Sequence, residues 1–137
     1  MTDNRLLIGY YRLSMEDDTD NESNSITNQR LLIKDYISAI PELLAMPYQE
    51  FYDDGYSGAS MERPAMQQVL QLVRQNRVQC IVVKDFSRFS RNYIEMGTYL
   101  EQVFPFMGIR FISVSDHYDS LAVSYTHLRA HETRHDL

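Results

Sequence analysis

The sequence has almost no cysteine and almost no lysine. Its single cysteine, Cys80, lies within an apolar run and can form no disulfide within the chain, so we expect a buried thiol in a protein of the reducing cytoplasm. The only lysines are Lys34 and Lys84, so arginine carries nearly all of the positive charge. No apolar stretch approaches the ~20 residues of a membrane-spanning helix, and the amino terminus lacks the pattern of a signal peptide, so we expect no membrane association.

Positive charge is also scarce overall. The chain has 13 Lys and Arg against 19 Asp and Glu, with a formal net charge of −6 at pH 7. Nonspecific DNA binding needs many phosphate contacts, so if DNA is the substrate, most of the affinity must come from elsewhere. A length of 137 residues with 44% apolar content is enough for one compact core.

Short apolar runs alternate with helical patterns along the chain. Runs that predict strands occupy residues 5–12, 49–52, 78–83 and 110–114. Three helices are predicted. The first follows the N-cap Ser25 and is ended by Pro41, the second starts at Pro64, and the third covers residues 96–104 and is ended by Gly108. The acidic stretch 15–24 predicts a loop. This alternation predicts a three-layer α/β domain over residues 1–121, with a largely parallel sheet of four or five strands flanked by helices.

Polar clusters follow three of the predicted strands. They contain Arg12 and Ser14, then Ser57 and Arg63, and then Ser87, Arg88 and Arg91. Ligands of parallel sheets bind beyond the carboxyl ends of strands, where the first and third clusters fall. Attack on a phosphodiester needs a nucleophile and fixed cations for the charge that grows on the phosphate oxygens, and the planar fork of arginine suits this best. The clusters therefore predict a hydroxyl nucleophile with four guanidinium groups.

In their order along the chain and in their residues, the three clusters resemble the motifs of the catalytic domain of serine recombinases. The motifs are Tyr-Arg-Leu-Ser at 11–14, Asp-Gly-Tyr-Ser-Gly at 54–58 followed by Arg63, and Val-Lys-Asp-Phe-Ser-Arg-Phe-Ser-Arg at 83–91. The resemblance runs from about Leu6 to about Asp119 and is strongest to the large serine recombinases that mobile elements carry as transposases or integrases. It implies a resolvase-like fold, DNA as the partner, homodimers that pair into tetramers, and no cofactor.

The resemblance also implies a role for each site residue. Ser14 would attack the DNA backbone and leave a phosphoserine link to the 5′ end and a free 3′ hydroxyl, which religation can reverse without ATP or metal. The residues that match phosphate-binding arginines are Arg12, Arg63, Arg88 and Arg91, and the supporting positions are Ser57, Gln29, Asp54 and Ser87. Whether Arg88 or Arg91 lowers the pKa of the serine or protonates the leaving oxygen is left open. Many relatives have an aspartate where this chain has Ser87, although Asp85 is near.

Residues 122–137 break the resemblance. Relatives continue into a long helix with the subunit interface and then a DNA-binding region, whereas this chain places His127, His131 and His135 at i, i+4, i+8 spacing. A zinc site is one interpretation. The string also resembles the translation of a transposon-based sequencing adapter, so we expect a non-native tail without a metal site. The natural protein would then be longer, and this segment alone inactive.

Two other classes of function are compatible with parts of the sequence. One is a catalytically silent module for subunit interaction, which would have no need to keep Ser14 and four arginines together. The other is a different phosphate-handling α/β or nucleotide-binding domain. The chain contains neither a G-x-G-x-x-G nor a G-x-x-x-x-G-K-[ST] loop, which disfavours that reading.

Overall fold

The computed structural model describes residues 3–14 and 25–122 of the chain. The predicted acidic loop at 15–24 lies outside the described residues, as does the predicted non-native tail with its three histidines, apart from its first residue. No helix in the described ranges is long and apolar enough to cross a membrane.

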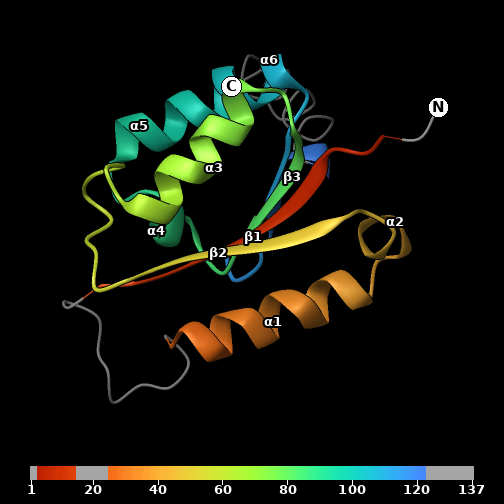
Figure 1. The fold of residues 1–137 in the computed structure, drawn as a ribbon, viewed down its shortest axis with the longest axis horizontal. Helices are drawn as coiled ribbons and strands as arrows, with labels where there is room; N and C mark the ends of the chain where they lie inside the picture. Colours follow the sequence, from red (N-terminus) through yellow and green to blue (C-terminus); the bar gives the residue numbers. More distant parts are fainter. Residues whose placement is uncertain (1–2, 15–24, 123–137) are drawn as a thin grey trace, which may run out of the picture.

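A single five-stranded sheet forms the centre of the fold (Figure 1). Its strands are β1 (Leu6–Leu13), β2 (Tyr48–Asp54), β3 (Val78–Val83), β4 (Arg110–Ser113) and β5 (Tyr118–Asp119). Their order in the sheet is β2-β1-β3-β4-β5; the first four are parallel and β5 is antiparallel to β4. This confirms the predicted α/β class and the four predicted strands, whereas the two-residue β5 was not predicted individually.

The helices are α1 (Ile26–Ser38), α2 (Pro41–Leu44), α3 (Pro64–Arg74), α4 (Phe86–Phe89), α5 (Tyr93–Thr98), the π-helical η2 (Tyr99–Val103) and α6 (Phe104–Met107). Two of the helices, α1 and α3, begin where capping residues indicated. The Ser25 Oγ accepts a hydrogen bond of 3.1 Å from the Asn28 N–H and caps α1, as predicted. Pro64 is the first residue of α3, because a helix start needs no N–H from that position.

Two helix boundaries differ from the prediction. The first helix ends at Ser38, and Pro41 starts the short α2 instead of only terminating α1. The predicted helix over 96–104 begins earlier, at Tyr93, and widens into η2 just before Pro105. A proline inside a helix lacks the N–H of the ordinary ladder and crowds the preceding turn, and a wider π turn accommodates it. Gly108 ends the stretch in a left-handed conformation, as its position indicated (φ 69°).

Helices cover both faces of the sheet. α1 lies on one face, and α3 with the α5–α6 stretch lies on the other (Figure 1). Side chains of β1 alternate between the two apolar cores, with Ile8 and Tyr10 in the core under α3 and with Leu7 and Tyr11 in the core over α1. Arg12 continues the Ile8 and Tyr10 series, so its side chain leaves β1 towards α3 and α4.

The chain reverses its direction of travel across the sheet between β1 and β3. It goes from β1 to β2 and then returns past β1 to β3, which is the arrangement that opens a crevice at the carboxyl ends of the two central strands. β3 pairs with β1 only as far as Gly9, opposite Val82. The last residues of β1 therefore extend beyond their β3 partner, and side chains are needed to pair with the backbone there.

Candidate active site

The three polar clusters meet at the carboxyl ends of β1 and β3, and the Arg12 side chain joins them. Its guanidinium donates to the Tyr56 carbonyl at 2.9 Å, the Ser87 carbonyl at 2.7 Å and the Arg88 carbonyl at 3.3 Å. Arg12 is fully buried. A side chain of the first cluster thus fixes the backbone of the other two.

Gly58 lies where these segments come closest. A Cβ atom at this position would lie 2.8 Å from Arg12 Nη2, 2.8 Å from Arg91 Cγ and 2.9 Å from the Ser87 carbonyl oxygen. The Gly58 carbonyl accepts the Arg91 N–H at 2.8 Å. Only a residue without a side chain permits this approach, so the predicted turn at 57–58 is also the contact between the second and third clusters.

Gln29 and Arg88 pair with the backbone of Arg12 where β3 no longer does. The Gln29 Oε1 accepts the Arg12 N–H at 3.2 Å, and its Nε2 donates to the Arg12 carbonyl at 2.9 Å. Arg88 Nη1 donates to the same carbonyl at 3.0 Å. Gln29 is fully buried, and Ser14, two residues beyond Arg12, is 2% exposed. The strand end that carries Ser14 is therefore held from α1 and from α4.

A carboxylate accompanies the third cluster although position 87 is a serine. Asp85 Oδ2 lies 3.5 Å from Arg88 Nε and 3.9 Å from Lys84 Nζ. The Ser87 hydroxyl donates to Asp85 Oδ1. Asp85 thus balances the charge of the buried Arg88.

Arg63 is turned into the protein interior. It is 1% exposed and stands directly before α3. Its Nε donates to the Ser60 carbonyl, its Nη1 to the Tyr10 hydroxyl and the Arg88 carbonyl, and its Nη2 to the Met61 sulfur and the Phe89 carbonyl. Arg63 therefore contacts the third cluster through the backbone of Arg88 and Phe89.

The remaining predicted residues lie at the surface. The side chains of Arg91, Asp54 and Ser57 are exposed, and the Ser57 Oγ accepts the Ala59 N–H at 3.1 Å within its own turn. Arg91 packs beside Gly58, whereas among the described residues no contact links the Asp54 carboxylate to the arginines. Within residues 3–14 and 25–122, no group of three or more His, Cys, Asp or Glu side chains is arranged to hold a metal ion.

Sequence reasoning did not single out Tyr10 and Asp53, which contact the site through Arg63. The Tyr10 hydroxyl donates to Asp53 Oδ2 at 2.6 Å and accepts from Arg63 Nη1 at 2.8 Å. Burial raises the pKa of Tyr10 far above its usual value; the Arg63 charge offsets part of this and the bond to Asp53 adds to it, so the hydroxyl stays protonated. The three sequence motifs include neither residue, and the available signal was a tyrosine on the same face of β1 as Arg12.

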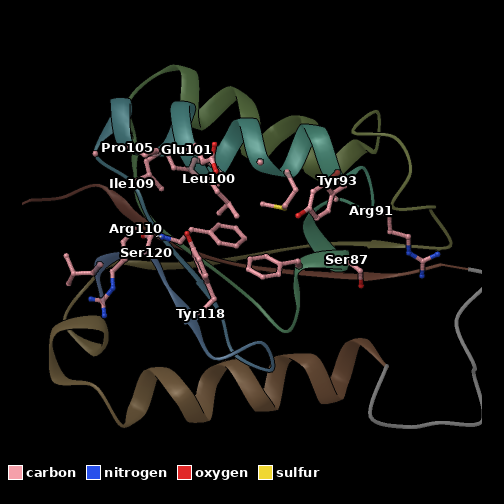
Figure 2. Close-up of a pocket in the computed structure, with 18 residues that line it drawn as sticks. Ser87, Arg91, Tyr93, Leu100, Glu101, Pro105, Ile109, Arg110, Tyr118 and Ser120 are labelled. Atoms are coloured by element: carbon pink, nitrogen blue, oxygen red, sulfur yellow. Dashed lines mark hydrogen bonds between the residues drawn. The ribbon is translucent and has the colours of Figure 1, made fainter. Parts of the chain in front are cut away.

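A groove of about 1500 Å³ lies between the α5–α6 stretch and the β4–β5 edge of the sheet (Figure 2). Ser87 and Arg91 lie at one end of it, and Arg110 and Ser120 lie at the other. Between them the lining is mainly aromatic and aliphatic, contributed by Phe86, Leu100, Phe104, Phe111 and Tyr118. Such a lining does not suit a phosphate, so the candidate active site only borders this groove.

Comparisons with known proteins agree with this geometry. A family model described as Resolvase, N terminal domain, matches residues 7–129. The N-terminal catalytic domain of TP901-1 integrase is 24% identical, with a TM-score of 0.71 over 96% of this chain and 97% of that chain. A resolvase family site-specific recombinase from Streptococcus pneumoniae is 24% identical, with a TM-score of 0.65 over 96% and 89%. A serine recombinase from Sulfolobus solfataricus is 25% identical, with a TM-score of 0.57 over 80% and 68%. A search of curated proteins found no match.

Proposed function

The chain belongs to the resolvase N-terminal domain family, the catalytic domain of serine recombinases, and from that premise we propose that it cleaves and rejoins DNA strands with Ser14 as the nucleophile. The observation that carries the proposal is the convergence of three separate polar clusters on the end of β1. Ser14 follows β1, where Gln29 and Arg88 form hydrogen bonds with the backbone of Arg12. A nucleophile must be held rigidly in this way to attack in line.

The proposed reaction is a transesterification. The Ser14 Oγ attacks the phosphorus of a DNA phosphodiester, its hydroxyl proton leaves, and the bond from phosphorus to the 3′ oxygen breaks. The 3′ oxygen takes up a proton, and the 5′ phosphate stays on Ser14 as a phosphoserine. Because one ester replaces another, a 3′ hydroxyl can reverse the step without ATP or a metal.

Arginines supply the charge that the transition state requires. Arg91 is exposed beside Gly58, whereas Arg88 and Arg12 are buried and bond to the backbone around the strand end that carries Ser14. Fixed guanidinium groups stabilise the negative charge that develops on the phosphate oxygens, and they need no reorganisation during the reaction. Arg88 and Arg91 are the candidates for protonating the leaving 3′ oxygen. Asp85 orients the Arg88 guanidinium, because its Oδ2 lies 3.5 Å from Arg88 Nε.

Most of the DNA affinity is proposed to come from outside this domain. A domain with a net charge of −6 can make few contacts with phosphates. The residues best placed for such contacts are confined to the carboxyl ends of β1 and β3. Homodimers that pair into tetramers are the assembly that the family resemblance implies. A silent subunit-interaction module would have no need of the ordered arrangement around Ser14.

Trapping the covalent intermediate tests the proposal. The full gene product is incubated with sheared genomic DNA of its source organism, quenched with detergent and assayed for protein–DNA complexes that survive denaturation. We expect such complexes from the wild type and none from Ser14→Ala, which should still bind DNA. Ser38→Ala is the matched control, because Ser38 is an exposed serine on α1 whose hydroxyl bonds only locally, to the Lys34 carbonyl. Covalent complexes formed by Ser14→Ala would refute the assignment.

A further inference from the structure

We propose that Arg63, Tyr10 and Asp53 form an internal brace that positions the Arg88 segment of the active site, so that Arg63 is a positioning residue and not a phosphate ligand. The name brace refers to these three residues only. Its effect on DNA cleavage rests on the proposed function, whereas its effect on the Arg88 segment does not.

Every hydrogen-bond donor of Arg63 is already used inside the protein. A guanidinium group has five N–H donors, and those of Arg63 have five acceptors. These are the carbonyls of Ser60, Arg88 and Phe89, the Tyr10 hydroxyl and the Met61 sulfur. With 1% of its surface exposed, Arg63 could meet a phosphate only by giving up bonds that hold the site together.

The buried charge of Arg63 is balanced through Tyr10. An isolated buried cation is costly, so it needs a partner of opposite charge. The Tyr10 hydroxyl accepts from Arg63 at 2.8 Å and donates to the Asp53 carboxylate at 2.6 Å. Asp53 also accepts the first free N–H groups of α3, from Ala65 at 2.9 Å and Met66 at 3.0 Å. The brace thus ties β1, β2 and α3 together at one point.

The brace acts on the active site through the backbone of the third cluster, because Arg63 donates to the Arg88 and Phe89 carbonyls. The Arg88 carbonyl accepts from Arg63 Nη1 at 3.1 Å and from Arg12 Nε at 3.3 Å. The Arg88 side chain in turn donates to the Arg12 carbonyl at 3.0 Å. If Arg63 shifts, the carbonyl that it shares with Arg12 shifts, and the reciprocal pair next to Ser14 is disturbed. Tyr10 and Asp53 are therefore positioning residues as well.

A structural readout tests the brace without DNA. Tyr10→Phe removes the linking hydroxyl and keeps the ring, and Tyr11→Phe is the matched control. Tyr11 is equally buried but faces the opposite core, where its hydroxyl contacts Tyr48 and Glu50. Amide hydrogen exchange is compared at Arg88, Ser90 and Arg91, whose N–H groups bond to the Asp85, Phe86 and Gly58 carbonyls.

We expect exchange at these three amides to become about tenfold faster in Tyr10→Phe, relative to the β3 amides that report global stability. Tyr11→Phe should leave that ratio unchanged. Equal ratios in the two variants would overturn the brace. Because neither measurement involves DNA or Ser14, this result stands whether or not the protein forms a phosphoserine.

DNA binding and cleavage then separate positioning from phosphate contact. In a Ser14→Ala background, affinity for sheared genomic DNA is measured against salt, since loss of one phosphate contact lowers the slope of log K against log salt by about 1. We expect no change in the magnitude of the slope for Arg63→Gln and a decrease of about 1 for Arg91→Gln.

With Ser14 present, Tyr10→Phe should slow single-turnover cleavage about tenfold without changing DNA affinity. A slope decrease of about 1 for Arg63→Gln, or full-rate cleavage by Tyr10→Phe, would refute the positioning role. If wild-type protein forms no covalent complex at all, the proposed function fails, and the exchange experiment alone decides on the brace.

Discussion

Replacing Gly58 with alanine should damage catalysis as well as folding stability. A methyl group at this position would lie 2.8 Å from both Arg12 Nη2 and Arg91 Cγ, and 2.9 Å from the Ser87 carbonyl oxygen. The Arg91 side chain can rotate away, but the carbonyl is backbone and Arg12 is held by three carbonyls. The strain must therefore move the second and third clusters apart by several tenths of an ångström.

The cost follows from the crowding. Overpacking by one methyl group destabilises a packed site by about 1–3 kcal/mol, and a displacement approaching 1 Å in an active site costs about 100-fold in rate. We therefore expect Gly58→Ala to lower the cleavage rate by about 10- to 100-fold and the free energy of unfolding by about 1–3 kcal/mol.

Gly97→Ala provides the matched control. Gly97 lies in α5, and a Cβ there would have no neighbour within 4 Å, so alanine should stabilise the helix by up to ~1 kcal/mol and leave cleavage unchanged. Both variants are compared by single-turnover formation of the covalent complex and by urea denaturation. A Gly58→Ala protein that cleaves at the wild-type rate would refute the tight contact between the clusters.

Two further predictions concern titratable groups away from the active site. Burial alone would raise the pKa of Glu50, but hydrogen bonds from Tyr11 and Arg30 more than offset it and the pKa lies below its ordinary value. The resulting stabilisation is present above the ordinary value near 4.5 and is lost as the pH falls through the lowered one. Glu50→Gln should therefore be less stable than wild type in urea at pH 7 and approach it at pH 3; an equal difference at both values would contradict this. Burial raises the pKa of Cys80 to about 12, so the native thiol should resist a disulfide reagent at pH 8 and react fully once the chain is unfolded in guanidinium; rapid reaction of the native protein would contradict its burial.

The main elements of the fold could be predicted because their signals are local. Val78–Val83 is a short run rich in β-branched residues and forms β3 with those bounds. Ser25 and Pro64 mark helix starts through their own hydrogen-bonding chemistry. The two-residue β5 has no such signal, because its pairing depends on a turn that folds it back against β4. The η2 segment was missed for a similar reason, since its i, i+5 ladder has no distinctive residue pattern.

Most of the residues that gather at the site could be predicted, although Asp54 is not linked to them and Tyr10 and Asp53 were not predicted. The direction in which the side chains point could not be predicted. An arginine after a strand end is visible in the sequence, whereas the carbonyls that Arg12 contacts become neighbours only after three segments have folded together. Asp53 accepts bonds from the start of α3 although it lies on β2, so no local capping pattern reveals it. Sequence reasoning therefore treats all four arginines alike, and only the structure separates the buried Arg63 from the exposed Arg91.

Mass spectrometry of the trapped protein–DNA complex tests most directly whether Ser14 is the nucleophile. After nuclease and protease digestion, we expect a nucleotide joined through its 5′ phosphate to the peptide that contains Ser14, with the fragment ions placing the link on that residue. A nucleotide attached to any other residue, or no adduct in a preparation that cleaves DNA, would contradict the assignment of Ser14 as the nucleophile.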